Sequence, residues 1–236
     1  MDSQSTQLAS TLPVHIGFIL DGNRRWAKEN GLPKLVGHKK GYENLKKIAE
    51  ECFDRGIKVV SAYIFSTENW KREKAEVDYL MDLALKLFQR DLKELIKKNI
   101  RVVVSGSRKR LSEKLILAIE KAEADTAKNT RGTVNICFNY GGQTEIADAI
   151  KEMLNSGVKA EEVTTELVRK NLYKPDLPPV DYIVRTSGEH RLSNFLLWDS
   201  AYAELNFVDL HWPAFSSQDL EQVLAEYDRR TRRFGL

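Results

Sequence analysis

Strand-like and helix-like stretches alternate along almost the whole chain of 236 residues, and this alternation constrains the fold more than any other feature. Residues 14–20 and 58–65 are short apolar or β-branched runs, as in buried strands. Residues 42–55 repeat apolar side chains at three- and four-residue steps and stop at Gly56, which is typical of an amphipathic helix. Because strands joined by helices pair in parallel, we predict an α/β fold: a single domain with a mostly parallel β-sheet flanked by helices.

The other elements continue this pattern. Further strands are predicted at residues 100–105, 134–138 and 182–185, and further helices at residues 75–98, 112–128, 162–172 and 217–229 and directly after the Gly141–Gly142 pair. The helix at residues 75–98 is the longest, a rod of about 36 Å. We expect residues 1–13 to form a flexible polar tail and residues 14–236 to form the single domain, because no linker rich in Gly or Ser divides them.

The charge and cysteine content limit the partners and the compartment. With 37 basic and 34 acidic residues the net charge is +3, which is too small to indicate a nucleic-acid-binding face but suits an anionic small substrate or lipid surface. No stretch approaches the ~20 apolar residues that span a bilayer, so any membrane contact is expected to be peripheral. Cys52 and Cys137 have no CxxC partner, which favours a reduced, cytoplasmic protein.

Polar segments follow the predicted strands, and parallel sheets bind ligands at the carboxyl ends of their strands. In DGNRRW, residues 21–26, Gly22 lets the backbone approach a ligand, and Arg24 and Arg25 supply bidentate donors. Asp21 would repel a bare diphosphate unless a hard cation such as Mg²⁺ bridged them. The segment therefore predicts a phosphate site, the alternative being that Asp21 caps a helix and the arginines are solvated.

A second anion site is predicted in RTSGEHRLS, residues 185–193, where Arg185, Arg191 and Ser193 have the chemistry to hold one diphosphate. The alternative is a surface loop in which Glu189 pairs with the arginines. Two anion sites imply two phosphorylated substrates, or one large one.

The histidines and the absent motifs narrow the function. His38 lies between Gly37 and Gly41 and is a candidate phosphate ligand, whereas His15 and His211 are expected to be structural and His190 has no assigned role. The chain has no GxxxxGK[ST], GxGxxG, GxSxG or HExxH motif. This argues against P-loop, dinucleotide-binding, α/β-hydrolase and zinc-hydrolase sites.

Five segments together resemble the signatures of the cis-prenyltransferase family, of the undecaprenyl diphosphate synthase type. They occur in the family's order between His15 and Phe215 and are HIGFILDGNRRWA, GHKKG, FSTENWKR, NYGG and RTSGEHRLSNFLLWDSAYAELNFVDLHWPAF. The resemblance implies an enzyme that transfers prenyl groups. It would extend an allylic diphosphate primer, typically farnesyl diphosphate, by successive isopentenyl diphosphate units to a cis-polyprenyl diphosphate of undecaprenyl-like length. It also implies Mg²⁺, an apolar tunnel for the growing chain and a homodimer.

The same resemblance assigns roles to residues of this sequence. Asp21 would be the central carboxylate for Mg²⁺ and diphosphate, Glu204 the second metal carboxylate, and Asn23 and Ser66 the relay that helps to remove the isopentenyl proton. The primer's diphosphate would lie on Gly22, Asn23, Arg25 and His38, and the isopentenyl diphosphate on Arg185, Arg191 and Ser193. The whole substrate-binding set is Gly22, Arg24, Arg25, Trp26, Lys34, His38, Phe65, Ser66, Glu68, Asn69, Trp70, Arg72, Glu76, Arg185, Arg191 and Ser193. The apolar face of residues 75–98 would take up the lipid tail or pack in the core.

Some positions depart from the family's pattern, and two other functions stay open. Arg24, Lys34, Glu73 and Gln143 differ from residues that are common in the family, which puts substrate preference and loop behaviour in doubt. A non-catalytic subunit of the family would lack the first carboxylate motif, which this chain keeps. A phospholigand-binding protein without catalysis would be hindered by carboxylates beside its anion sites.

Overall fold

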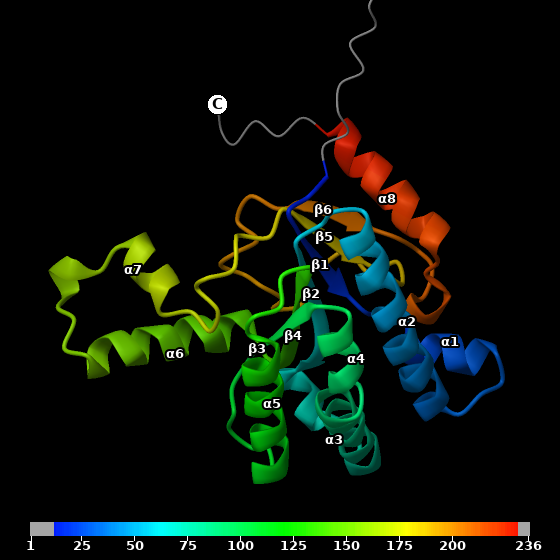
Figure 1. Ribbon diagram of the computed structural model, residues 1–236, viewed down its shortest axis with the longest axis horizontal. Helices are drawn as coiled ribbons and strands as arrows, with labels where there is room; N and C mark the ends of the chain where they lie inside the picture. Colours follow the sequence, from blue (N-terminus) through cyan, green and yellow to red (C-terminus); the bar gives the residue numbers. More distant parts are fainter. Residues whose placement is uncertain (1–11, 231–236) are drawn as a thin grey trace, which may run out of the picture.

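Six parallel strands form one sheet at the centre of the computed structural model, which describes residues 12–230 (Figure 1). The strands are β1 (His15–Ile19), β2 (Val59–Ser66), β3 (Ile100–Ser105), β4 (Gly132–Tyr140), β5 (Tyr182–Arg185) and β6 (Glu204–Phe207), in the spatial order β3-β4-β2-β1-β5-β6. Every neighbouring pair is parallel, so the predicted sheet is confirmed. The expected tail, residues 1–13, lies outside the described residues except for Leu12 and Pro13.

Helices connect the strands and cover mainly one face of the sheet. They are α1 (Asn23–Glu29), α2 (Lys34–Asp54), α3 (Lys74–Gln89), α4 (Leu92–Lys97), α5 (Glu113–Thr126), α6 (Gly142–Asn155), α7 (Thr165–Lys170) and α8 (Ser217–Arg229), with 3₁₀ turns η1 (Thr67–Lys71), η2 (Ala160–Glu162) and η3 (Trp212–Ala214). The bounds predicted for β5 and α8 are confirmed. The hydroxyl of Ser112 caps α5 by accepting from the Leu115 N–H. Within residues 12–230, no helix is long and apolar enough to cross a membrane.

The main hydrophobic core lies between one face of the sheet and helices α2, α3, α5 and α8. Phe18 of β1 contributes to this core, whereas Ile19 points to a smaller cluster on the other face with Phe195. The two successive residues face opposite ways because side chains alternate along a strand. In Figure 1, α6 and α7 project away from this body.

The strand order places a crevice at the carboxyl ends of β1 and its neighbours. From β1 the chain passes to β2, then to the edge strand β3 and back to β4 between them, and later adds β5 and β6 on the other side of β1. The connections that follow β1 and β5 therefore leave in opposite directions, and such a switch point opens a space for ligands. The segments that follow β1 and β5 both begin there.

The single helix predicted at residues 75–98 is wrong: α3 ends at Gln89, and α4 begins at Leu92. At the break the Asp91 N–H donates to the carbonyl of Lys86, five residues back, instead of four. The Asp91 carboxylate accepts hydrogen bonds from Tyr42 and Lys46 of α2. A tertiary contact therefore interrupts an apolar period that is continuous in the sequence.

Other predicted bounds also change. Helix α2 begins at Lys34, eight residues before the predicted start, and so contains His38. Its Gly37 and Gly41 are needed for close packing on α1, because a Cβ at either position would lie 2.0 or 2.1 Å from an oxygen of Asn23. The short helix predicted at residues 162–172 is divided into η2 and α7. Strand β6 was not predicted, because it is a four-residue edge strand with polar Glu204 and Asn206.

Candidate active site

One cavity of about 970 Å³ opens at the carboxyl ends of β1, β2 and β5. Its mouth is polar and mostly cationic, with side chains from α1, α2, η1 and the segment after β5: Asp21, Asn23, Arg24, Arg25, Lys28, Lys34, His38, Ser66, Glu68, Asn69, Arg72, Arg185, Ser193 and Asn194. Its deeper wall is apolar and comes from α2, α3 and the sheet: Leu45, Ile64, Leu80, Leu83, Ala84, Leu87, Phe88, Ile136 and Phe138. The cavity therefore suits a ligand with an anionic head and an apolar tail.

Asp21 and Arg185 form the centre of the mouth. Asp21 Oδ2 accepts from Arg185 Nη2 at 2.9 Å, and Oδ1 accepts from the Gly22 N–H at 2.8 Å. Burial opposes ionisation, but these donors and the nearby Arg25 outweigh it and hold the pKa of Asp21 below its usual value. Asp21 is thus an ionised carboxylate at the end of β1, about one-third exposed to the cavity.

Arg185 also joins Asp21 to the second predicted anion loop. Its guanidinium, only 4% exposed, donates to Ser193 Oγ at 2.7 Å and to the Arg191 carbonyl. Arg191 itself is 59% exposed and pairs with Glu189, which Arg25 also contacts. The structure therefore supports an anion site at Arg185 and Ser193, and the surface-pair alternative describes only Arg191.

Two buried polar atoms at this mouth have no hydrogen-bond partner among the described residues: Asn23 Oδ1 and Arg185 Nε. Buried polar atoms are normally paired, so an unpaired one indicates a missing water or ligand. Asn23 begins α1 directly after Asp21–Gly22, and its amide nitrogen donates to the Leu20 carbonyl at 3.2 Å.

Glu76 holds together the cationic groups of the other side of the mouth. The carboxylate is 1% exposed, and it lies 2.9 Å from Arg72, 3.2 Å from His38, 3.7 Å from Lys34 and 3.8 Å from Arg24. Burial disfavours its charge, but Arg72 and Arg24 keep the pKa of Glu76 below its usual value. Burial lowers the pKa of His38 in spite of Glu76, so its ring is largely neutral at pH 7.

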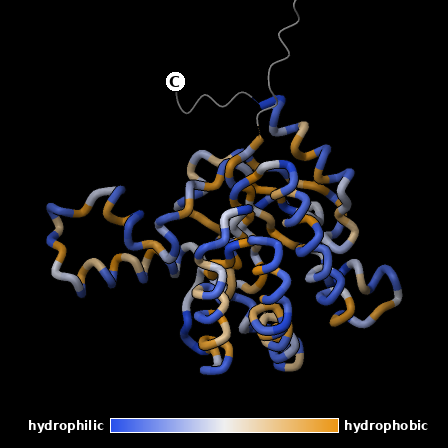
Figure 2. The backbone as a smooth tube through the Cα atoms, in the orientation of Figure 1, coloured by the Kyte–Doolittle hydropathy of each residue, from blue (hydrophilic) through white to orange (hydrophobic). Residues whose placement is uncertain are grey.

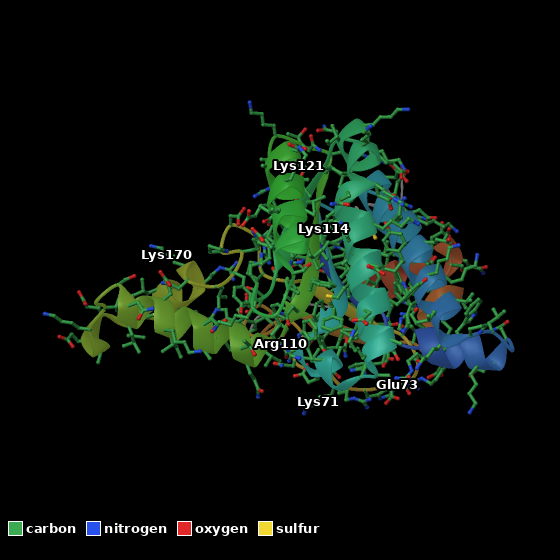
Figure 3. All side chains as sticks on the ribbon, turned by 90° about the horizontal axis from the view of Figure 1, so that it is seen from below. Lys71, Glu73, Arg110, Lys114, Lys121 and Lys170 are labelled. Atoms are coloured by element: carbon green, nitrogen blue, oxygen red, sulfur yellow. The ribbon has the colours of Figure 1, made fainter. Side chains whose placement is uncertain are left out.

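The segment between β2 and α3 covers the mouth. Ser66 caps η1 together with Asn69, and Asn194 binds Glu68 at 3.0 Å. Trp70 is fixed by its N–H to Asn139 at 2.7 Å and by the Arg110 guanidinium 4.3 Å above its ring. Figure 3 shows Lys71 and Glu73 of this segment on the same side of the molecule as Arg110, whereas Lys114 and Lys121 lie along α5.

Most of the predicted site residues line the cavity, but several do not. Phe65 is fully buried and packs between Trp70 and Phe138, so the Phe65 and Trp70 rings support the segment from outside the cavity. Trp26, Glu76 and Arg191 are also absent from the lining, although Glu76 and Arg191 contact residues that belong to it.

The predicted metal pair of Asp21 and Glu204 is not brought together by this chain. Glu204 lies opposite Tyr182, whereas Arg185, which binds Asp21, lies opposite Phe207. Tyr182 and Arg185 are three residues apart, so Glu204 lies about 10 Å along the strands from the position that binds Asp21. Glu204 instead binds Arg230 at 2.9 Å. Because β6 was not predicted, the sequence did not indicate at which end of the sheet Glu204 lies.

Sequence reasoning missed Lys28, Tyr42, Tyr63 and Asn194 as lining residues. Lys28 lies one helical turn after Arg24 on α1, so its position follows once that helix is assigned. Tyr63 donates from its hydroxyl to the Ser193 carbonyl at 3.2 Å, a contact between distant segments that no local pattern indicates.

The fold and this site define an α/β protein with a cavity suited to an amphiphilic phosphate ester at the switch point of its sheet. Comparisons with known proteins agree. A family profile described as "Putative undecaprenyl diphosphate synthase" matches residues 19–235. An isoprenyl transferase of Listeria innocua is 46% identical over 98% of this chain and 94% of its own length. One from Thermotoga maritima is 45% identical over 95% and 97%.

Two solved structures have the same fold. Lavandulyl diphosphate synthase from Lavandula x intermedia, in complex with dimethylallyl diphosphate, has a TM-score of 0.90 at 32% identity and covers 95% of this chain and 99% of its own. A probable undecaprenyl diphosphate synthase from Campylobacter jejuni has a TM-score of 0.81 at 30% identity, with 96% and 100% covered. The chain belongs to the undecaprenyl diphosphate synthase family, and it is a prenyltransferase.

Proposed function

We propose that this enzyme extends an allylic diphosphate primer by successive condensations with isopentenyl diphosphate, forming a cis-polyprenyl diphosphate. The observation that carries the proposal is the single cavity that joins a cationic mouth to an apolar interior. Each buried CH₂ of a prenyl tail contributes about 0.8 kcal/mol to binding, so the interior favours a lengthening hydrocarbon chain.

The mouth supports two diphosphate subsites. In the proposal the primer's diphosphate lies against Gly22, Arg25 and His38. The isopentenyl diphosphate lies against Arg185 and Ser193, with Arg191 reaching it from the rim. Arg185 also binds Asp21, so the Asp21–Arg185 ion pair connects the two subsites. In the proposal this connection holds the allylic carbon close to the incoming double bond.

In the proposed reaction the allylic C–O bond breaks and diphosphate leaves with the bonding electrons, while the terminal carbon of the isopentenyl double bond forms the new C–C bond. A proton is then lost from the neighbouring methylene and restores a double bond. Asn23 and Ser66 line the cavity and would relay that proton towards the released diphosphate. The arginines stabilise the charge that develops on the leaving oxygen.

The chemistry of the donors fits Mg²⁺ bound through a substrate. No group of three or more His, Cys, Asp or Glu side chains within residues 12–230 could hold a metal ion. Asp21 offers an ionised, partly exposed carboxylate, and Mg²⁺ binds through one or two carboxylates together with phosphate oxygens. When bound, the metal would neutralise charge on the departing diphosphate. Asp21 would hold it, and Arg185 would orient the carboxylate.

The primer, the product length and the assembly are further parts of the proposal. We expect farnesyl diphosphate as primer and a product of undecaprenyl-like length. That a similar synthase was solved with dimethylallyl diphosphate supports an allylic diphosphate at this site. We also expect a homodimer. The cytoplasmic location, with or without peripheral membrane contact, stays a prediction.

The test is a radiolabel assay with purified protein, labelled isopentenyl diphosphate and a farnesyl, geranyl or geranylgeranyl primer, in Mg²⁺ or EDTA. The expected result is a lipid product that forms only with Mg²⁺, and chromatography then gives its length. No product with any primer would favour the non-catalytic subunit. Diphosphate binding without turnover would favour a phospholigand-binding protein.

A further inference from the structure

Three side chains form a hydrogen-bonded relay directly behind the turn that presents Asp21. Ser187 Oγ and His211 Nδ1 are 2.6 Å apart, and His211 Nε2 lies 2.9 Å from Glu29 Oε1. Glu29 is the last residue of α1, Ser187 follows β5, and His211 precedes η3. The Ser187–His211–Glu29 relay thus joins three segments that are far apart in the sequence.

The contacts indicate which atoms of the relay donate hydrogen bonds and which accept them. The Glu29 carboxylate is an acceptor, so it binds the tautomer of His211 that carries its proton on Nε2. In a neutral ring Nδ1 is then an acceptor, and the Ser187 hydroxyl donates to it. Glu29 is 63% exposed and His211 is 16% exposed, so the buried hydrogen bond to Ser187 is the stronger link.

The side chains of Ser187 and His211 pack against the backbone of Gly22. A Cβ at Gly22 would lie 2.6 Å from His211 Nδ1 and 2.7 Å from Ser187 Oγ, so only glycine fits there. Gly22 has a φ of +99°, and its N–H donates to the Asp21 carboxylate. The neighbours of the relay hold the same turn, because the Thr186 hydroxyl and the Trp212 N–H both donate to the Asp21 carbonyl. Movement of the relay would therefore move the Asp21–Gly22 turn.

The backbone of Ser187 indicates that its hydroxyl has a specific use. Its φ is +82°, a conformation that glycine adopts freely and that costs a residue with a side chain about 1 kcal/mol or more. Ser187 is 5% exposed and does not line the cavity, so the hydroxyl is not placed to attack a ligand. What the serine gains over glycine here is the hydrogen bond to His211.

We propose that the Ser187–His211–Glu29 relay is a positioning device that fixes the Asp21–Gly22 turn for the diphosphate of the allylic primer. This inference rests on the proposed function for the identity of the ligand. Ser187 and His211 act through Gly22 and are not catalytic residues. Their loss should affect the primer's diphosphate more than the isopentenyl diphosphate. The Ser187 carbonyl accepts from Arg25, which the proposed function assigns to the primer, whereas it assigns Arg185 and Ser193 to the isopentenyl diphosphate.

Paired substitutions separate positioning from stability. Ser187→Gly and Ser187→Ala both remove the hydroxyl, but only glycine relieves the left-handed backbone, so Ser187→Gly should melt at a higher temperature than Ser187→Ala. His211→Leu removes the acceptor. His211→Asn places an amide oxygen near the position of Nδ1 and should rescue the contact with Ser187. Ser217→Ala is the matched control, because it removes a serine hydroxyl that binds Glu51 away from the cavity.

The readouts are the Kd of inorganic diphosphate with Mg²⁺, measured by calorimetry, and the KM of each substrate. We expect Ser187→Gly, Ser187→Ala and His211→Leu to raise the Kd and the allylic KM by about tenfold. The isopentenyl KM, the control and His211→Asn should stay within about twofold of the wild type. The proposal is overturned if the defects follow the melting temperatures, if both KM values rise equally, or if nothing changes. If the wild-type protein binds diphosphate but shows no turnover, the proposed function is contradicted. In that case the Kd values of the variants for diphosphate still test the positioning role of Ser187 and His211.

Discussion

At the scale of single residues, the mouth of the cavity carries its own counter-ions. Asp21 pairs with Arg185, and Glu76 pairs with Arg72 and lies near Lys34 and Arg24. Buried or half-buried cations are costly without a partner, so these carboxylates stabilise the folded chain before any ligand binds. A diphosphate that enters must compete with Glu76 for the same cations, whereas Asp21 can share a metal ion with it.

Asp21→Ala should lower turnover by about 10³-fold or more, because it removes the carboxylate that would hold the metal at the leaving diphosphate. Asp21→Asn, which has the same shape without the charge, should be almost as inactive. Turnover is measured at saturating Mg²⁺, and circular dichroism checks that both variants fold. Near-normal turnover in either variant would contradict the assignment of Asp21 to the metal.

Arg191→Ala should raise the KM for isopentenyl diphosphate by about tenfold, the effect of one lost charge-assisted hydrogen bond at an exposed position. Arg191 is 59% exposed and its side chain pairs with Glu189, so the melting temperature should not change. Arg229→Ala on α8 is the control for loss of one positive charge. An unchanged KM and kcat would remove Arg191 from the site.

Sequence reasoning located Asp21 and Arg185 because their positions follow from the end of a strand. Asp21 follows β1 and Arg185 ends β5, and the parallel sheet then brings them together without further information. Glu204 and Trp70 show the limit. Glu204 lies at the other end of its strand, and the Trp70 ring packs on Phe65 and Arg110 outside the cavity lining. Such orientations depend on contacts between distant segments, which a local pattern does not contain.

At the scale of secondary structure elements, α6 is anchored to the sheet by a buried acid. Glu145 accepts from the Tyr140 hydroxyl and from the Tyr173 N–H at 3.1 Å. Burial raises the pKa of Glu145 from 4.5 to about 7, in spite of these donors. Between about pH 4.5 and pH 7 the folded chain therefore binds more protons than the unfolded chain, and stability falls as the pH rises through this range.

Glu145→Gln should remove this dependence, because glutamine keeps an acceptor for the Tyr173 N–H but does not ionise. Between pH 4.5, the ordinary pKa of Glu, and pH 7, the pKa in the folded chain, ionisation of Glu145 should cost the wild type up to about 3 kcal/mol of unfolding free energy. The variant should not show this loss. Urea unfolding at pH 5 and pH 8 measures both. Equal pH dependence in the two proteins would show that Glu145 is not the titrating group.

The break between α3 and α4 places Tyr42 at the far end of the cavity. Burial and Asp91 raise the pKa of Tyr42 well above its usual value, so its hydroxyl stays protonated and donates to Asp91. Tyr42 and Leu87 line both the large cavity and a second one of about 50 Å³ beyond it. The break could not be predicted from the continuous apolar period of residues 75–98. Periodicity indicates which face of a helix is buried, but not which residues cover that face.

Tyr42→Ala should connect the two cavities and lengthen the main product by one or more isoprene units. Tyr42→Phe is the matched variant, since it keeps the ring and loses only the hydrogen bond to Asp91, and its product length should match that of the wild type. Chromatography of the radiolabelled lipids gives both distributions. An alanine variant that folds and makes the wild-type length would show that the product ends elsewhere.

At the scale of the whole molecule, α6 and α7 form an arm, residues 142–170, that leaves the body of the protein (Figures 1 and 2). Its root is fixed by Glu145 and by the hydrogen bond of 2.8 Å from Tyr173 to Asp148. Further out, Ile150, Leu154 and Val163 are 46%, 67% and 50% exposed. Exposed apolar side chains gathered on a projecting element are typical of an association surface.

We expect a second copy of the chain to cover this arm, which would give the homodimer that the family resemblance implies. Because Ile150 and Leu154 lie one helical turn apart on α6, a charge at both positions should be unfavourable in a desolvated interface. Ile150→Glu/Leu154→Glu should therefore sediment as a monomer at micromolar concentration, and the wild type as a dimer. Glu152→Lys, on the same helix, is the control for an altered charge without loss of apolar surface. If the double variant stays dimeric, or if the wild type is monomeric, the arm is not the dimer contact. Turnover of the monomeric variant then shows whether one chain is sufficient for catalysis. This bears on Glu204, which is predicted to bind the metal but lies away from Asp21 within a single chain.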